Sequence, residues 1–590
     1  MIKSENKICQ NCKQDFIIEP EDFQFYEKMK VPAPTWCPEC RLKRRFSFAT
    51  DRSLYKRVCD LCGKDIIYSY PGDKGIIVYC NNCWWSDKWD GAQYAQGYDP
   101  SLPFLKQVKQ LISKTPKVAL DSNYPTLVNS EYVNHCATAK NCYLIFTADE
   151  CENVLYSEFL LNDKDCMDST ILEKAELCYG NINCGNSYRL LYSEDCDSCQ
   201  NVLFSKDCIG CSNCFSCVGL RNKQFNIFNQ QYSREEYEKK VKGFGAHSYR
   251  NVQEIGVKAR EFWLTRPHKY AHAVRNANTT GDYVYGAKNS RNMYIVSEGS
   301  ENSRYCQLIT MSKVKDAYDY TIWGNGVQRI YESLLTGESA DTIKFSFQVW
   351  PNVRNIEYSF FVISSAYMFG CANIRNKKYC ILNKEYSKEE FESLRERIIK
   401  EMNENPYVDA KGRIYKYGEF FPNELSLSGY NESYAMDFFP LTREEAIFDG
   451  YNWYEPQPSA HKATLRLQDV PDSIHDVDDS ILNEIIECAQ CKKPFKIIAS
   501  ELSLLRRFAA PIPRKCPNCR YRERLSHVNP PRLYRRNCMC QGASSLNSKF
   551  ENTVKHQHGD VPCTNEFETS YAPDRPEIVY CEQCYQAEVA

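Results

Sequence analysis

Residues 136–231 carry a repeat whose period is neither that of a helix nor that of a flat strand. Its cysteines are all separated by multiples of three residues: Cys136, Cys142, Cys151, Cys166, Cys178, Cys184, Cys196, Cys199, Cys208, Cys211, Cys214 and Cys217. The tags YSEDC and FSKDC, which end at Cys196 and Cys208, lie one line of twelve residues apart. A helix has a period near 3.6 and a strand a period of about 2, so this fixed repeat predicts a solenoid.

The length of the repeat limits what its interior can hold. Twelve residues at roughly 3.3 Å each make a loop only about 40 Å around. Such a loop has no room for a core of Leu and Phe side chains. The residues in phase with the cysteines are mostly small or apolar, such as Ala139, Ser157 and Ser205. We therefore interpret the stretch as a narrow β-solenoid with Cys, Ser and Ala pointing inward.

The cysteines of this stretch have three alternative roles. A free cysteine is a small hydrophobic residue that packs well, and buried structural thiols are usually inert. Stacked thiolates inside a rod can also hold soft metal ions. Disulfides between coils are the third alternative, and they depend on an oxidising compartment.

Length, charge and the first residues indicate the class of protein. A chain of 590 residues is expected to form several domains, and its net charge of −2 provides no overall field for nucleic acid or membrane. No stretch approaches the roughly 20 apolar residues of a membrane span. The start, MIKSENKIC, lacks the apolar region of a secretory signal. We therefore expect a cytoplasmic protein whose paired cysteines bind metal rather than form disulfides.

Four CxxC pairs in residues 1–90 predict two zinc sites. Each pair offers two thiolates from a tight turn, and two pairs complete a tetrahedral shell around Zn²⁺. Sequential pairing closes shorter loops than an interleaved pairing does. The expected sets are therefore Cys9, Cys12, Cys37 and Cys40, then Cys59, Cys62, Cys80 and Cys83. Sites filled by four cysteines leave no open position, which favours structural over catalytic zinc.

The sequence CQNCKQDF from Cys9, FYEK from Phe25 and PTWCPECR from Pro34 resemble a known kind of module. They are similar to the small "probable zinc-ribbon" or treble-clef-like domains of bacteria, in which the CPxCR element starts a short helix. The whole chain also resembles long, uncharacterised multi-zinc-ribbon proteins of small-genome bacteria. The resemblance implies zinc and a fold for the module, and it implies no activity.

A second copy of this module returns 479 residues later. Cys488, Cys491, Cys516 and Cys519 repeat the first set. The next pair is one residue shorter, and by analogy we assign the fourth zinc to Cys538, Cys540, Cys581 and Cys584. The insert before the last pair contains His556, His558 and Cys563. Any of these three can replace a ligand, because a tight CxC pair chelates less comfortably than CxxC.

Both copies continue into a segment in which basic and aromatic residues alternate. Such segments can grip phosphates and stack on bases. The alternative is a solvated helix face with ordinary packing, which a duplication would also repeat. The residues predicted to contact nucleic acid are Arg41, Lys43, Arg44, Arg45, Tyr55, Lys56, Arg57, Arg520, Arg522, Arg524, Tyr534, Arg535 and Arg536.

The remaining sequence divides the chain. Ser233 with Glu236 and Ser387 with Glu390 are capping boxes, so a helix is expected after each of two solenoids. The second solenoid has larger in-phase residues and little cysteine. The predicted fold is mainly β with short helices. Its parts are a double zinc module (1–90), a linker with a helix (91–135), a Cys-rich β-solenoid (136–245), a second β-solenoid (276–402), a linker region (403–484) and a second double zinc module (485–590).

Function is inferred mainly from the basic segments. No P-loop, GxGxxG, GxSxG or HExxH motif occurs, and no paired-carboxylate motif was found. Our leading hypothesis is a non-enzymatic, zinc-dependent nucleic-acid-binding scaffold that prefers RNA to DNA, with the ribosome as one setting. The first alternative is a protein–protein interaction or structural scaffold, since solenoids present long flat walls. The second is an enzyme that uses the loop of His556, His558 and Cys563 or a pocket between the solenoids.

Overall fold

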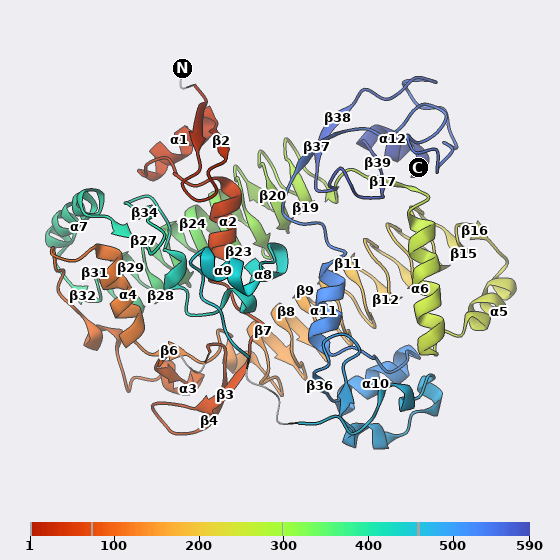
Figure 1. Ribbon diagram of the computed structural model, residues 1–590, viewed down its shortest axis with the longest axis horizontal. Helices are drawn as coiled ribbons and strands as arrows, with labels where there is room; N and C mark the ends of the chain where they lie inside the picture. The colour runs from red at the N-terminus through yellow and green to blue at the C-terminus, as the bar shows by residue number, and fades with distance from the viewer. Residues whose placement is uncertain (1–2, 72–74, 298, 457–460, 590) are drawn as a thin grey trace. The chain divides into compact units, whose positions relative to one another are not determined.

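A computed structural model of the chain describes residues 3–71, 75–297, 299–456 and 461–589 (Figure 1). The fold is mainly β, with twelve α-helices among these residues. The chain forms two compact units, and each unit is built from two distant segments. Unit 1 comprises Met1–Leu120 and Ala271–Glu455, and unit 2 comprises Asp121–Tyr270 and Pro456–Ala590. The N-terminal cysteine module therefore shares a unit with the second predicted solenoid, and the C-terminal module with the first.

Unit 2 contains a series of parallel strands that we call the first stack. Neighbouring strands are offset by twelve residues, as in Thr170↔Ile182 and Gln200↔Ser212, and only the last pairing is antiparallel. This offset equals the period of the sequence repeat. The strands are β7 (Asn134–Lys140), β8 (Phe146–Glu152), β9 (Glu158–Leu161), β10 (Thr170–Glu173), β11 (Ile182–Gly185), β12 (Tyr188–Leu191), β13 (Gln200–Leu203), β14 (Ser212–Phe215), β15 (Gln224–Ile227) and β16 (Gln230–Gln231).

The backbone of the first stack explains the spacing of three. From His135 to Phe228, every third residue has a positive φ, and each of these precedes an inward-facing position. The left-handed conformation costs a non-glycine residue roughly 1–2 kcal/mol, and Asn and Asp tolerate it best. Side-chain ladders accompany it: Asn141 Nδ2 donates to Asn153 Oδ1 (3.0 Å), and Asn153 Nδ2 donates to Asp165 Oδ1 (2.8 Å). A corner therefore recurs every three residues, and the interior receives one side chain per corner.

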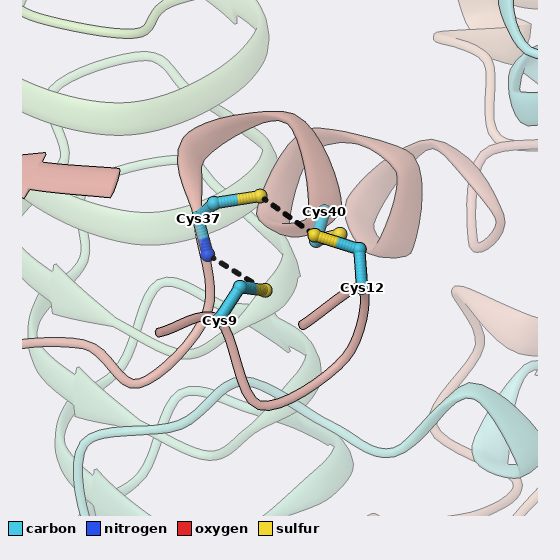
Figure 2. Close-up of side chains that lie close together, drawn as sticks. All are labelled: Cys9, Cys12, Cys37 and Cys40. Carbon is cyan, nitrogen blue, oxygen red and sulfur yellow. Dashed lines mark hydrogen bonds between the residues drawn. The ribbon is translucent and has the colours of Figure 1, made fainter. Parts of the chain in front are cut away.

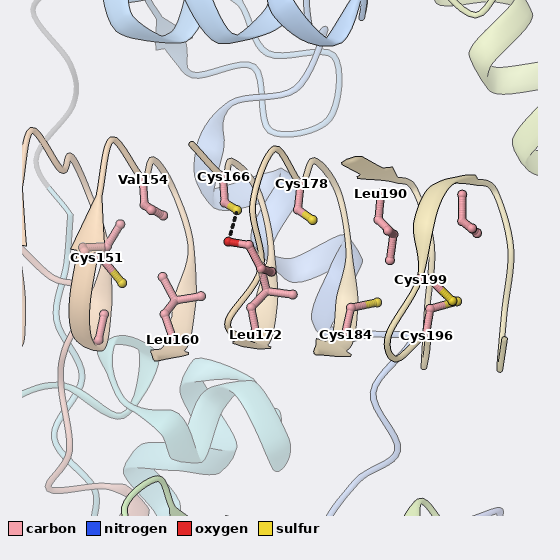
Figure 3. Packing of buried hydrophobic residues seen from close by; sticks show 14 of the residues in the cluster. Cys151, Val154, Leu160, Cys166, Leu172, Cys178, Cys184, Leu190, Cys196 and Cys199 are labelled. Atoms are coloured by element: carbon pink, nitrogen blue, oxygen red, sulfur yellow. Dashed lines mark hydrogen bonds between the residues drawn. The ribbon is translucent and has the colours of Figure 1, made fainter. Parts of the chain in front are cut away.

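The cysteines of the first stack are buried thiols that pack with aliphatic neighbours (Figure 3). Each sulfur lies near backbone carbonyls. Cys166 Sγ, for example, donates to Lys164 O at 3.2 Å and to Ala175 O at 3.5 Å. Within the described residues, none of these twelve cysteines belongs to a group able to hold a metal ion. The packing role is therefore the one that the structure supports.

Helices follow the first stack as the capping box predicts. α5 (Arg234–Phe244) begins after Ser233, whose Oγ accepts from Glu236 N at 3.3 Å. α6 (Tyr249–Trp263) packs with α5 against Phe204 and Phe215 of the stack. The rest of unit 2 contains β17 (Pro267–Lys269), β35 (Ile486–Glu487), β36 (Pro494–Phe495), α10 (Ala499–Phe508), α11 (Pro517–Leu525), β37 (Tyr534–Asn537), β38 (Glu566–Thr569), β39 (Ile578–Tyr580) and α12 (Glu582–Val589).

Unit 1 contains a second stack of parallel strands. Its offsets are thirteen residues near the middle (Val314↔Val327) and twelve near the end (Arg354↔Ala366). Its interior is filled mainly by Val and Ile, with three cysteines in the cluster. The strands are β18 (Ala273–Val274), β19 (Gly281–Tyr285), β20 (Met293–Val296), β21 (Ser300–Glu301), β22 (Gln307–Ile309), β23 (Val314–Gly324), β24 (Val327–Gly337), β25 (Asp341–Lys344), β26 (Phe347–Val349), β27 (Arg354–Glu357), β28 (Phe360–Ile363), β29 (Ala366–Phe369), β30 (Ala372–Arg375), β31 (Lys378–Ile381) and β32 (Lys384–Glu385).

The remaining elements of unit 1 surround the second stack. α7 (Lys388–Glu404) begins after the predicted cap Ser387. The others are β1 (Glu5–Ile8), β2 (Asp15–Ile18), α1 (Pro20–Met29), α2 (Pro38–Phe46), β3 (Tyr55–Val58), β4 (Asp65–Tyr68), β5 (Val78–Tyr79), α3 (Asn81–Trp84), α4 (Phe104–Lys114), β6 (Lys117–Val118), β33 (Tyr407–Val408), β34 (Ile414–Tyr415), α8 (Tyr434–Phe438) and α9 (Arg443–Phe448). Every helix of the described residues is too short or too polar to span a membrane.

Candidate metal centres and buried arginine clusters

The first cysteine group lies where a hairpin meets a helix (Figure 2). Cys9 and Cys12 occupy the turn between β1 and β2, while Cys37 is the N-cap of α2 and Cys40 lies in its first turn. The four sulfurs lie within 4.8 Å of one another, and Cys12 Sγ is 3.8 Å from Cys37 Sγ. Sulfurs about 2.3 Å from a tetrahedral zinc lie about 3.8 Å apart, so this spacing fits Zn²⁺.

Two further groups repeat this geometry. Cys62 Sγ lies 3.9 Å from Cys80 Sγ, and Cys491 Sγ lies 3.7 Å from Cys516 Sγ. These distances fit a shared metal and far exceed the roughly 2.05 Å of a disulfide. The structure thus brings together the predicted sets Cys59, Cys62, Cys80 and Cys83, and Cys488, Cys491, Cys516 and Cys519.

Backbone N–H groups favour the thiolate form that a metal requires. Cys37 N donates to Cys9 Sγ, and Cys516 N donates to Cys488 Sγ, each at 3.2 Å. Burial raises the pKa of Cys488, but the N–H groups of Cys491 and Cys516 outweigh it and lower that pKa to about 6. A thiol in this state loses its proton near neutral pH, and the thiolate is the metal ligand.

The fourth group differs from the prediction by one ligand. Cys563 lies with Cys538, Cys581 and Cys584, whereas Cys540 lies outside this set. Cys563 Sγ is 3.9 Å from Cys581 Sγ. One residue between Cys538 and Cys540 is too few to form the CxxC turn that directs two sulfurs to one centre. The insert supplies the missing ligand, because Cys563 N donates to Cys540 O at 2.9 Å and positions the thiol.

A fifth group contains Cys540, His556, His558 and Cys584. Cys540 Sγ lies 3.1 Å from His556 Nδ1, and Cys584 Sγ lies 3.3 Å from His558 Nε2. A tetrahedral zinc with one sulfur and one nitrogen ligand would place them about 3.5 Å apart, so these pairs are slightly compressed. The histidine pair is therefore directed at thiols and is not a solvated loop feature. Five groups in the described residues can hold metal ions.

The basic residues of α2 face the second stack. Arg41, Arg44 and Arg45 are each no more than 1% exposed. Arg41 Nη2 lies 2.8 Å from Asp319 Oδ2, and Arg45 Nη1 lies 3.2 Å from Asp319 Oδ1. Arg45 Nε also donates to Thr321 Oγ1 at 3.1 Å. Two arginines of one helix thus bind one aspartate on β23.

Arg44 completes the cluster with two more carboxylates. Its Nη2 lies 2.9 Å from Glu332 Oε2 on β24, and its Nη1 lies 3.2 Å from Glu419 Oε2. Its guanidinium also stacks 4.3 Å from the ring centroid of Trp36. Three guanidinium groups therefore meet three carboxylates away from water. Buried charges are tolerated only when they are paired in this way.

Helix α11 makes the same contact with the first stack in unit 2. Arg520 Nε and Arg524 Nη1 lie 2.8 and 3.0 Å from the carboxylate of Asp168. Arg520 Nη2 also lies 3.0 Å from Glu501 Oε1, and Arg524 Nε donates to Thr170 Oγ1 at 3.5 Å. Two arginines again meet two carboxylates. The Asp-x-Thr pattern is common to both stacks, and the sequence analysis did not identify it as a partner of the arginines.

These contacts correct the predicted role of five arginines. Their guanidinium groups bind carboxylates in the interior and present no surface to a phosphate. The residues concerned are Arg41, Arg44, Arg45, Arg520 and Arg524. The alternative of ordinary packing, repeated by duplication, describes them better, although as buried ion pairs and not as a solvated face.

One duplicated position points outward in both copies, and a second does so in one copy only. Lys56 and its counterpart Arg535 are both exposed, the latter with 80% of its side chain. Arg522 is exposed, while its counterpart Lys43 lies 3.6 Å from Asp449. The basic residues of the two copies therefore fall into two sets, one that faces the interior and one that is exposed. The exposed set, called the outward basic set, contains Lys56, Arg522 and Arg535.

Arg535 pairs with Glu566, whose Oε2 lies 2.5 Å from Arg535 Nη2, and four other predicted contact residues also have protein partners. Arg57 Nη2 lies 2.6 Å from Asp60 Oδ1, and Arg536 Nη1 donates to Ala572 O at 3.1 Å. Tyr55 donates its hydroxyl to Glu432, and its ring packs on Tyr454. Tyr534 is half-buried on β37, opposite Thr569. These four residues brace the modules.

Unit 2 also contains a cavity of about 210 Å³. It lies between the first stack, α6 and the segment that leads into α11. Most of its charged groups are paired: Glu194 with His527 (2.8 Å), Lys515 with Glu523 (2.8 Å), and Asp168 with Arg520 and Arg524. Lys206, outside the lining, lies 2.7 Å from Glu194. Burial raises the pKa of Glu194, but Lys206 and His527 outweigh it and lower that pKa to about 2. The cavity therefore holds fixed ion pairs.

Comparison with known proteins does not identify the chain. No family model matches the sequence, and no curated protein matches it. Among solved structures, a putative acetyltransferase from Desulfovibrio desulfuricans G20 aligns over 52% of this chain and 85% of its own. The identity is 11% and the TM-score is 0.09. This likeness is too weak to indicate a shared fold or activity.

Replacing one carboxylate of the unit 1 cluster should destabilise that unit strongly. Asp319→Asn leaves three buried guanidinium groups with two carboxylates, and we expect a loss of about 3–5 kcal/mol. Tryptophan fluorescence during urea unfolding reports unit 1, because seven of the eight tryptophans lie there. The matched control is Asp449→Asn, which removes the partly exposed partner of Lys43 and should cost at most about 1 kcal/mol. Equal effects of the two variants would contradict a buried cluster.

Removing the metal should loosen α2 and α11 before it affects the stacks. Cys37 and Cys516 cap these helices and are candidate ligands, so chelation frees the helix ends. Under reducing conditions with a strong chelator, we expect faster hydrogen exchange in both helices. The central strands β24 and β13 should stay protected, and added zinc should restore the helices. Unchanged protection of α2 and α11 in metal-free protein would show that the metal does not hold them.

Proposed function

We propose that the protein is a zinc-dependent, non-enzymatic scaffold built from two β-solenoids, each carrying a double zinc module. The observation that carries this proposal is the repeated contact between an arginine helix and a stack. In both copies the helix that starts at a candidate zinc ligand directs its arginines into the stack. Through their ion pairs, these arginines hold each module on its stack.

The β-solenoid part of the proposal is supported by register and backbone. Parallel strands follow one another at offsets of twelve residues, and a left-handed corner recurs every third residue. Four corners per turn would give each coil a narrow, four-sided interior. Side chains at Asn129, Asn141 and Asn153 form a ladder along one outer edge. Such regular walls suit extended protein partners.

The zinc part is supported by the donor sets. The sulfur spacings fit a tetrahedral ion, and each cysteine group fills all four positions with protein ligands. Closed sites of this kind stabilise folds and do not bind substrate. A hairpin turn and a helix N-terminus supply the ligands of the first group, which is the arrangement expected of a treble-clef-like or zinc-ribbon module.

Nucleic-acid binding is the second candidate, and the outward basic set favours it. Lys56 and Arg535 occupy equivalent positions on β3 and β37 and are both exposed. Arg522 adds a third exposed cation on α11. Lys56 belongs to unit 1, and Arg522 and Arg535 belong to unit 2, so each unit offers far fewer exposed cations than the thirteen predicted contact residues. Salt-sensitive binding by these few residues would therefore be weak.

One capture experiment separates the two candidates. The full-length protein is crosslinked in its own cell extract at low salt, purified with and without nuclease, and compared with the triple variant K56E/R522E/R535E. The scaffold proposal expects the same protein partners in all three samples. Nucleic acid that is enriched with the wild type and lost in the variant would instead establish the second candidate. Reversal of the exposed Lys239, Lys258 and Lys400 on other helices controls for net charge.

A further inference from the structure

The fourth and fifth metal groups share one ligand. Cys584 lies within 4.8 Å of Cys538, Cys563 and Cys581, and equally within that distance of Cys540, His556 and His558. It is the second cysteine of the last CxxC pair and lies in the first turn of α12. Cys584 is 2% exposed, and Cys540 is fully buried. A thiolate in this position faces two sets of donors at once.

The two histidines are held as metal ligands usually are. His556 turns Nδ1 to Cys540, while its Nε2 lies 2.8 Å from Glu588 Oε1. His558 turns Nε2 to Cys584, while its Nδ1 donates to Val561 O at 2.7 Å. A carbonyl can only accept, so the proton of His558 sits on Nδ1 and the lone pair of Nε2 points inward. Metal-binding histidines characteristically donate their outer N–H to a carboxylate or carbonyl.

Outer contacts also hold the thiol of Cys540. Asn552 Nδ2 donates to Cys540 Sγ at 3.1 Å, and Tyr580 donates its hydroxyl to Asn552 Oδ1 at 2.8 Å. The chain Tyr580–Asn552–Cys540 therefore fixes the position of the sulfur inside the module. Such supporting contacts are a usual part of metal sites.

Charge also favours a second ion. The two groups together contain five cysteines and two histidines. Metal-bound cysteines are thiolates, so a centre that binds all five carries five negative charges; one divalent ion would leave three of these charges and two ions leave one. Isolated buried charge is expensive, so the second ion removes most of that cost.

We propose that these seven side chains form one dinuclear zinc centre in which the Cys584 thiolate bridges the two ions. One zinc is bound by Cys538, Cys563, Cys581 and Cys584, and the other by Cys540, His556, His558 and Cys584. Each ion then has four protein ligands, so the centre is closed and structural. The full chain then binds five zinc ions, one more than the four sites predicted from the spacing of its cysteine pairs. The inference extends the zinc part of the proposed function and does not depend on the partner.

Native mass spectrometry of the full-length protein tests the metal count. We expect five zinc ions in the wild type and four in the variant H556Q/H558Q. The control is Cys217→Ser, which removes a buried thiol of the first stack in a column that already holds Ser193 and Ser205. This control should keep five. Four zinc ions in the wild type would overturn the dinuclear centre while leaving the other metal sites intact.

Cobalt substitution of the wild type tests the bridge and needs no variant that has to fold. Two Co²⁺ ions joined by one thiolate couple magnetically, so five bound ions should give the electron paramagnetic resonance intensity of three. Full intensity for five ions would rule out a shared Cys584. A protein that binds no metal at any of the five groups would instead refute the zinc part of the proposed function, so the two failures are distinguishable.

Discussion

A buried guanidinium group needs hydrogen-bonding partners that compensate its charge, and carboxylates of the stacks supply them to the arginines of the modules. Arg41 and Arg45 in unit 1, and Arg520 and Arg524 in unit 2, each share one aspartate with a helix neighbour one turn away. Each helix is also fixed at its N-terminus by a cysteine of a candidate zinc site. Metal and ion pairs thus act on the same short helix from two sides.

The repeated contact gives the duplication a physical meaning. A stack with left-handed corners places Asp319 on one copy and Asp168 on the other at positive φ. Two residues after each aspartate, Thr321 accepts from Arg45 and Thr170 accepts from Arg524. Arg45 and Arg524 therefore use the same atoms to contact the aspartate and the threonine of their stacks. A metal bound at each cysteine group would hold the helix in the position where these contacts form.

Local spacing predicted much of this structure, and long-range partners did not follow from it. The twelve-residue period of Cys196 and Cys208 equals the strand offset, because each parallel strand pairs with the segment twelve residues later. CxxC spacing likewise grouped three cysteine sets, since each pair forms within one turn. The ion pair between Arg45 and Asp319 could not be predicted from local spacing, because the two residues lie 274 positions apart in the sequence. Nor did sequence order reveal that the N-terminal module shares a unit with the second stack.

Arginine footprinting of the native protein tests the central claim most directly. The full-length, metal-loaded chain is treated with an arginine-specific dicarbonyl reagent, and modified peptides are quantified by mass spectrometry. The account predicts that Arg41, Arg45, Arg520 and Arg524 stay unmodified until the protein unfolds, while Arg535 reacts at once. Modification of these four at the rate of Arg535 would contradict a buried contact between module and stack.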